Sequence, residues 1–203
     1  MFPNVILQHI AELKVVKLST KYHRSNDIVY NIGNKYILKV SENIDGLEKE
    51  RDANDLLKDY PYFSKSVEFT IVENKAYYLK TMVKGTPLVL NKYLKKPLKL
   101  VDLLVDGIKL FHSIDLGKIG LGYNKGDVLV HGDFCLPNIL AYNGKISGFI
   151  DLSGFTVGDP WIDYAWCVWS LEYNLNTKEY TPILLEKLGI TFDLEKYKKY
   201  TEM

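Results

Sequence analysis

Three polar side chains in the second half of the chain have the types and spacing that a metal-dependent phosphoryl transfer requires. Asp133 and Asn138 lie in the segment HGDFCLPNIL with four residues between them, and Asp151 lies near the end of the segment NGKISGFIDL. In phosphoryl-transfer sites this spacing supplies a base for the acceptor hydroxyl and an oxygen ligand for Mg²⁺. A hairpin turn at Asn143-Gly144 would bring Asp151 back beside Asn138 as a second metal ligand.

The first half of the chain offers groups that could hold the nucleotide. Lys39 lies near the end of the segment YILKV, and Glu50 follows in a helical segment, with Glu48 as the second choice of partner. A lysine held by a glutamate in this way contacts the α- and β-phosphates. The backbone of Thr81 and Val83, in the segment leading out of this half, could hydrogen-bond adenine.

The elements that must position these groups are predicted by hydrophobic periodicity and turn signals. Strands are expected over 15–20, 27–32, 35–40 and 66–82, the last interrupted by a turn near Asn74, with a tight turn at Gly33-Asn34. Helical spacing indicates helices over 1–16, 45–60, 97–115 and from 161 to the end. Strands over 128–134 and 138–152 would carry the three polar side chains.

A cluster of breakers, Gly85 and Pro87, suggests a lobe boundary at Val83–Lys84. We expect an α+β, bilobed fold: a nucleotide-binding lobe over 1–83, with an antiparallel sheet and one main helix, and a mainly helical lobe over 84–203 for catalysis and acceptor binding. The nucleotide would bind in the cleft between them.

Composition narrows the class of partner. The 26 Lys and Arg residues and 25 Asp and Glu residues give a formal net charge of +1, which provides no electrostatic footprint for nucleic acid. Cys135 and Cys167 form neither a disulfide framework nor a metal-ligand cluster. No segment has the length or apolarity of a membrane span or a signal peptide. A cytoplasmic protein with a small-molecule partner is expected.

The chain resembles the aminoglycoside phosphotransferases, antibiotic-resistance kinases with a fold like that of eukaryotic protein kinases. The resemblance rests on LFHSID, HGDFCLPNIL, NGKISGFIDL and GDPWIDYAW, and it continues weakly into LLEKLGI. It covers most of the chain, and the segment from His131 to Trp166 is most similar to the kinases of sugar 3′-hydroxyls, such as kanamycin kinase.

The resemblance implies a role for each matching residue. Asp133 would be the catalytic base, Asn138 and Asp151 the Mg²⁺ ligands, Lys39 the phosphate-binding lysine and Glu50 its partner. Ser25 matches a serine of the family's nucleotide-covering loop. Asp163 would brace the catalytic loop, and His131 would orient the metal aspartate. ATP or GTP would be the phosphoryl donor.

Two features depart from the family pattern. The family commonly follows the metal aspartate with Gly-Arg, whereas DLSGFTV follows here without an arginine. The family's helical insertion before the catalytic loop is reduced to LGKIGLGYNKGDVLV. Aminoglycosides are polycations, and the carboxylates that could bind one here are Asp133, Asp159, Glu172 and Glu202 with the chain end.

The expected reaction is transfer of the γ-phosphoryl group to a hydroxyl of an aminoglycoside-type amino sugar. One alternative is a kinase of another small alcohol, such as choline, homoserine or a macrolide. The other is a nucleotide-binding module with little catalysis. Cys135 is expected to be a packing residue, and Trp161, Ala165 and Trp169 are expected to share the buried face of a helix.

Overall fold

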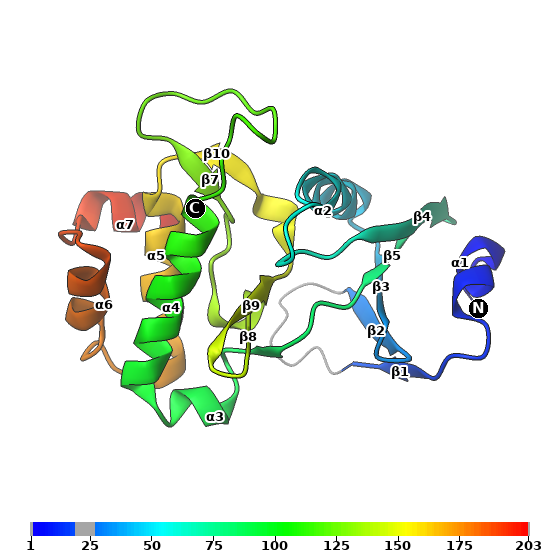
Figure 1. Cartoon of the computed structure of the whole chain (residues 1–203), viewed down its shortest axis with the longest axis horizontal. Helices are drawn as coiled ribbons and strands as arrows, with labels where there is room; N and C mark the ends of the chain where they lie inside the picture. The colour runs from blue at the N-terminus through cyan, green and yellow to red at the C-terminus, as the bar shows by residue number, and fades with distance from the viewer. Residues whose placement is uncertain (1, 19–26, 203) are drawn as a thin grey trace. The chain divides into compact units, whose positions relative to one another are not determined.

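The polypeptide divides into two units, Met1–Val83 and Lys84–Met203 (Figure 1). The computed structural model describes residues 2–18 and 27–202, so Ser25 lies outside the described residues. The boundary falls at the residues where the sequence indicates a break.

An antiparallel sheet forms most of the first unit. Its described strands are arranged in the order β1-β2-β3-β5-β4. Their bounds are β1 Val15–Lys17, β2 Ile28–Ile32, β3 Tyr36–Ser41, β4 Ser66–Val72 and β5 Lys75–Thr81. The β2–β3 turn places Gly33 and Asn34 at φ values of 61° and 54°, the left-handed backbone that a tight hairpin needs. The hairpins therefore form where the turn residues predict them.

Strand alternation gives the two faces of this sheet different partners. Leu38, Val40 and Leu79 pack with Ile6 and Ile10 of helix α1 (Asn4–Ile10). Residues one position along point to the opposite face. There, Ala76 and Tyr78 of β5 pack against Leu47 of helix α2 (Ile44–Leu56). Lys39, which pairs with Tyr78 across the strands, lies on this second face beside α2.

The helix expected over 1–16 is shorter than predicted. It ends at Ile10, and Glu12 then adopts a φ of 66°, which no α-helix accommodates. Val15 and Val16 instead pair with Ile32 and Asn31 of β2. The two valines favour a strand edge over a continued helix because β-branched side chains suit extended backbone.

Helices make up most of the second unit. Their bounds are α3 Asn91–Leu94, α4 Pro97–His112, α5 Trp161–Leu175, α6 Thr181–Leu188 and α7 Leu194–Thr201. Helices α4, α5 and α6 contact one another, and α7 packs on α5 (Figure 1). Buried Leu100, Leu104, Ile108 and Phe111 form the inner face of α4.

Two small antiparallel sheets complete this unit. Strand β8 (Ile139–Tyr142) lies between β6 (Thr86–Pro87) and β9 (Lys145–Phe149). Strand β7 (Val128–Val130) pairs with β10 (Thr156–Gly158). The 3₁₀ turn Leu136–Asn138 leads into β8, and a second 3₁₀ turn, Leu152–Gly154, follows β9. The β8–β9 hairpin therefore brings the chain back to the level of Asn138.

The aromatic residues of α5 only partly match the expected core face. Trp161 and Ala165 are buried with Tyr200 of α7. Trp169 is only half-buried, and its ring stacks on exposed Tyr173 at 5.1 Å between centroids. The core prediction is therefore wrong for Trp169, which lies at the rim because the buried face of α5 turns toward Val168 and Leu171.

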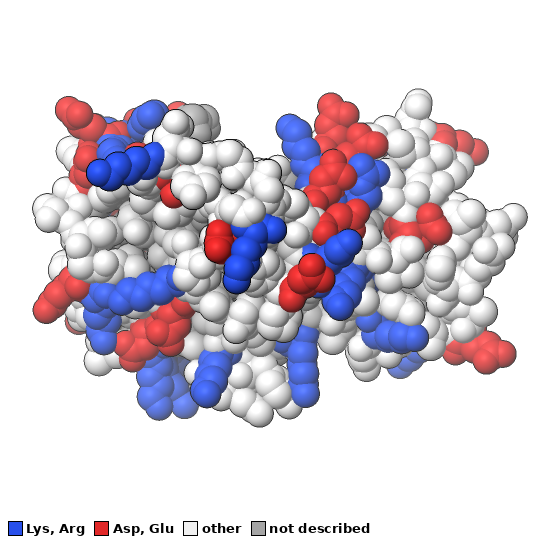
Figure 2. Space-filling model, turned by 45° about the horizontal axis from the view of Figure 1, so that its top comes forward, with Lys and Arg blue, Asp and Glu red and all other residues white. Residues whose placement is uncertain are grey.

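The surface matches the balanced composition. Basic and acidic side chains lie interspersed on the face drawn in Figure 2. Among the described residues, every helix is too short or too polar to cross a lipid bilayer.

Candidate active site

The loop after β7 is shaped by a close approach of two backbones. Gly132 has a φ of 81°, and a Cβ atom there would overlap the carbonyl group of Gly154. Only glycine accommodates both this φ and this contact without strain. The HGD segment and the turn after Asp151 are therefore packed directly against each other.

Asp133 and Asn138 are joined by their side chains. Asn138 Nδ2 donates to Asp133 Oδ2 at 2.9 Å and to the Asp133 carbonyl oxygen at 3.0 Å. Asp133 is half-buried and Asn138 is buried. The amide oxygen Oδ1 carries the lone pairs that the amide nitrogen lacks, so Oδ1 is the atom of this side chain that can bind a metal. The four-residue spacing thus produces a carboxylate with a fixed orientation.

Asp151 is held beside this pair through its neighbour in sequence. The N–H of Ile150 donates to the Asn138 carbonyl oxygen at 3.0 Å, and His131 Nε2 donates to the Ile150 carbonyl oxygen at 3.0 Å. Nδ1 of His131 accepts the N–H of Asp133, so the partners fit the neutral Nε2–H tautomer. His131 therefore positions the loop, as expected from the sequence.

The backbone at Asp151 is unusual. Its φ of 63° and ψ of 61° lie in the left-handed region, which non-glycine residues rarely adopt. Such conformations cost free energy and cluster at functional sites.

Asp163, in the first turn of α5, is the brace of the loop. Its Oδ2 accepts the N–H of His131 at 2.9 Å and Nε2 of His112 at 3.0 Å. Its Oδ1 accepts the N–H of Gly132 at 3.0 Å. The sequence motif LFHSID contains His112, but its contact with Asp163 was not predicted because the two residues are far apart in the chain.

Cys135 lies inside the loop but has the environment of an inert thiol. Burial raises the pKa of its thiol far above the usual range, and the neighbouring Asp133 carboxylate raises it further. The nucleophilic thiolate is therefore strongly disfavoured. The expectation that Cys135 is a packing residue is confirmed.

In the first unit, Lys39 makes the ion pair that the sequence suggested. Its Nζ lies 3.0 Å from Glu50 Oε2 and 3.3 Å from Asp27 Oδ2. Glu50, rather than Glu48, is the partner, because it lies three residues after Leu47 and so on the face of α2 that packs on the sheet. Lys39 and Glu50 are thus brought together.

A second lysine, Lys80 of β5, also contacts Glu50. Its Nζ pairs with Glu50 Oε1, and both side chains are buried. Burial alone would raise the pKa of Glu50, but the charges of Lys80 and Lys39 lower it to about 2. Sequence reasoning missed Lys80, although strand alternation could have found it: it shares the buried face of β5 with Ala76 and Tyr78.

The two residues expected to contact adenine, Thr81 and Val83, differ in whether their backbone groups are already hydrogen-bonded within the sheet. The N–H of Thr81 donates to the Lys65 carbonyl oxygen at 2.9 Å, and its Oγ1 accepts the N–H of Lys65. Its backbone donor is therefore engaged. Val83 lies beyond the end of β5, outside the ladder of the sheet.

The donor set suits magnesium. Asn138 and Asp151 offer hard oxygen atoms, and Mg²⁺ commonly takes one or two protein ligands, with waters and substrate phosphates completing the octahedron. Among the described residues there is no group of three His, Cys, Asp or Glu side chains that could hold a metal by itself. Asn138 and Asp151 are therefore the residues that would hold such an ion.

Two of the carboxylates considered for binding a polycation are engaged within the chain. Asp159 Oδ2 pairs with Lys196 Nζ at 2.7 Å, and Glu172 Oε1 accepts from Thr181 Oγ1 at 2.8 Å. The Lys196 hydrogen bond helps to lower the pKa of Asp159 against the opposing effect of burial. Asp159 and Glu172 thus have structural roles in the second unit.

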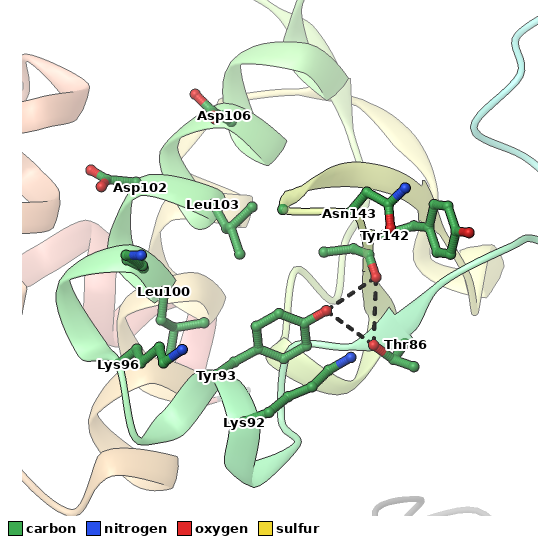
Figure 3. Close-up of a pocket in the computed structure, with 13 residues that line it drawn as sticks. Thr86, Lys92, Tyr93, Lys96, Leu100, Asp102, Leu103, Asp106, Tyr142 and Asn143 are labelled. Carbon is green, nitrogen blue, oxygen red and sulfur yellow. Dashed lines mark hydrogen bonds between the residues drawn. The ribbon is translucent and has the colours of Figure 1, made fainter.

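A cavity of about 640 Å³ lies at the other end of the β8–β9 hairpin (Figure 3). It is lined by the α3–α4 region and the hairpin turn, including Tyr93, Leu103 and Asn143. The hydroxyl of Tyr93 hydrogen-bonds Thr86 Oγ1 and the Ala141 carbonyl oxygen at its edge. Asp133, Asn138 and Asp151 are not among its lining residues, so this cavity is separate from the candidate site.

Part of the chain matches a family model, and several curated proteins are similar to it. Residues 124–200 match the phosphotransferase enzyme family. A probable aminoglycoside 3′-phosphotransferase of Lactococcus lactis is 29% identical over 153 residues, covering 70% of this chain and 58% of the relative. An aminoglycoside 3′-phosphotransferase of Enterococcus faecalis is 41% identical over 73 residues, covering 36% of this chain and 28% of the relative. The matches thus span less than two thirds of these relatives.

Solved structures resemble the fold over nearly the whole chain. The aminoglycoside phosphotransferase APH(3'')-Id of Streptomyces rimosus, in complex with ADP and streptomycin, superposes with a TM-score of 0.75 at 15% identity, covering 96% of this chain and 93% of that one. The aminoglycoside phosphotransferase APH(4)-Ia, with AMP-PNP and hygromycin B, gives 0.68 at 16% identity, covering 95% and 85%. The α+β, kinase-like fold expected from the sequence is confirmed.

Proposed function

We propose that the chain transfers the γ-phosphoryl group of ATP or GTP to a hydroxyl of a small molecule, with an aminoglycoside-type amino sugar as the leading acceptor. The observation that carries the proposal is the side-chain hydrogen bond between Asp133 and Asn138, with Asp151 held next to it through Ile150. It combines a proton acceptor with oxygen ligands for a metal. The matched relatives are named as aminoglycoside 3′-phosphotransferases, and solved relatives bind ADP or AMP-PNP.

Each residue has one task in this proposal. Asp133 accepts the proton of the acceptor hydroxyl, and the hydrogen bond from Asn138 holds its carboxylate in orientation. Lys39 holds the α- and β-phosphates. Val83 and the carbonyl of Thr81 contact the adenine ring of the nucleotide. Ser25 covers the phosphates. Mg²⁺, held by Asn138 and Asp151, would neutralise charge on the phosphates.

The proposed location is the cytoplasm, where nucleotide is available. Both cysteines are free and buried, which fits a reducing compartment.

Two substitutions test the role of Asp133 as catalytic base separately from the role of Asp151 as metal ligand. Asp133→Asn should lower turnover by a factor of about 10² to 10⁴, while Mg-ATP affinity changes little, because general-base catalysis typically contributes that much. Asp151→Asn should weaken Mg-ATP binding itself, and asparagine tolerates the left-handed backbone there. Asp106→Asn, at an exposed position of α4, is the matched control. Equal loss of nucleotide binding in both site variants would contradict the assigned roles.

A panel of acceptors tests the substrate. Phosphorylated product is measured with kanamycin, choline, homoserine and a macrolide in turn. Product with kanamycin supports the leading acceptor, and product with choline alone overturns it in favour of another small alcohol.

A nucleotide-binding module with little catalysis is the second candidate. It is favoured by the internal engagement of Asp159 and Glu172 and by the lack of an arginine after Asp151. Tight binding of Mg-ATP in calorimetry, with no phosphorylated product on any acceptor, would support this candidate over the kinase.

A further inference from the structure

The buried carboxylate of Glu50 is held by two ammonium groups, one at each oxygen. Lys80 contacts Oε1 and Lys39 contacts Oε2. Lys80 reaches Glu50 because strand alternation places it on the same face of the sheet as Lys39, diagonally across the β3–β5 pair. The aromatic ring of Tyr78 also lies 5.3 Å from the Lys80 ammonium.

The charged groups form an inner and an outer pair. The side chains of Glu50 and Lys80 are 1% and 5% exposed, whereas those of Lys39 and Asp27 are 12% and 14% exposed. Each pair has no net charge. The difference in exposure makes Lys39 the lysine that can reach a ligand in solution, while Lys80 stays with the carboxylate.

We propose that Lys80 is a positioning residue of the nucleotide site, which neutralises Glu50 from inside the sheet so that Lys39 can give its charge to a phosphate. This inference rests on the proposed function of Lys39 as the phosphate lysine. With a single lysine, a phosphate would compete with Glu50 for the same ammonium group. Withdrawing that ammonium would leave a buried carboxylate without a counter-charge, which is strongly unfavourable.

The electrostatics of Glu50 agree with this division of labour. Burial is the largest influence and acts to raise the pKa of Glu50, and the charge of Lys80 is the largest influence that lowers it, ahead of Lys39. Lys80 is therefore the principal counter-ion of Glu50. Lys39 is the secondary one and is also shared with Asp27.

Calorimetric titration with Mg-ATP at pH 7 tests the inference. Lys80→Met should weaken binding at least tenfold although Lys39 is intact, because Glu50 then holds Lys39 alone. In a Glu50→Gln background no counter-charge is needed, so adding Lys80→Met should change the affinity less than threefold. Lys75→Met, at an exposed position of the same strand that pairs with Glu42, is the control and should bind like wild type.

A second measurement does not depend on nucleotide. Carboxyl ¹³C NMR of Glu50 should show a larger rise in pKa for Lys80→Met than for Lys39→Met. If Lys80→Met alone does not fold, the Lys80→Met, Glu50→Gln double variant keeps the test open, since it leaves no buried charge unpaired.

The outcomes distinguish a failure of the positioning role of Lys80 from a failure of the proposed function. An equal loss of affinity from Lys80→Met in both backgrounds, or a larger pKa rise in Lys39→Met, overturns the role of Lys80. The role of Lys80 is also overturned if the Lys80→Met, Glu50→Gln double variant binds Mg-ATP tenfold more weakly than Glu50→Gln. If wild type itself binds no Mg-ATP, the proposed function fails, and the positioning role falls with it.

Discussion

Glu50 in the first unit and Asp163 in the second are both almost completely buried carboxylates, at 1% and 0% exposure, but they are stabilised in different ways. Glu50 is held by two lysine side chains. Asp163 accepts two backbone N–H groups and one imidazole nitrogen. The first arrangement balances charge, and the second holds a backbone conformation.

The difference corresponds to what each region must do. A lysine side chain has several rotatable bonds, so it can transfer its contact from a carboxylate to a ligand. Backbone N–H groups cannot move without moving the chain. We therefore expect Glu50 to belong to an adjustable cluster and Asp163 to a rigid loop.

Removing Asp163 should have the largest effect. Asp163→Ala leaves the buried N–H group of His131 and the part-buried N–H group of Gly132 without an acceptor, and each unsatisfied buried group costs about 1–3 kcal/mol. The free energy of unfolding in urea should therefore fall by about 4 kcal/mol. Asp163→Asn keeps an acceptor oxygen and should lose about half as much. A loss below about 1 kcal/mol for Asp163→Ala would show that the loop is not rigid in the expected sense.

Substitution of Gly132 tests whether the backbone of the loop held by Asp163 is rigid. Gly132→Ala combines a left-handed φ with an overlap against Gly154, so we expect a loss of about 3 kcal/mol. Gly144→Ala has a similar φ of 76° but open space around the position, and it should lose about 1 kcal/mol. Thermal unfolding of the two variants measures the difference. Equal losses would mean that the contact with Gly154 contributes nothing.

The charge of Glu50 should give the stability a pH dependence. The pKa of Glu50 is lowered from 4.5 to about 2, so its ionised form stabilises the fold fully above about pH 4.5, and this contribution is lost as the pH falls toward 2. Compared with Glu50→Gln, wild type should lose roughly 2–3 kcal/mol of stability between pH 5 and pH 2. Urea unfolding across this range measures it, and a constant difference would contradict the ion-pair account.

Removing one partner from each carboxylate should have the smallest effects. His112→Phe takes one of three partners from Asp163 and should cost about 1–2 kcal/mol. Lys39→Met leaves Lys80 on Glu50 and should cost less than about 1 kcal/mol. Chemical unfolding of both variants tests the order. A larger loss for Lys39→Met would mean that Lys80 cannot neutralise Glu50 alone.

Local patterns were sufficient to predict most of the fold. The glycine and asparagine turns at Gly33-Asn34 and Asn143-Gly144 adopt left-handed backbone, and the strands beside them alternate as expected. The spacing of Asp133 and Asn138 was enough to predict that their side chains lie close together, because only four residues separate them.

Contacts between distant segments were harder to predict. The bond from His112 to Asp163 joins residues 51 positions apart, and no periodicity encodes it. Lys80 was missed because a lysine in a strand is usually exposed, and its burial depends on the carboxylate of Glu50 on α2. The first helix was predicted too long because the turn at Glu12 has no glycine or proline to mark it.

The left-handed backbone at Asp151 has an evolutionary consequence. Asparagine and glycine, each one nucleotide change away from an aspartate codon, are the residues that accept this conformation most readily. Either replacement would suit the backbone at this position while deleting the carboxylate. The backbone conformation alone therefore does not require an aspartate at position 151.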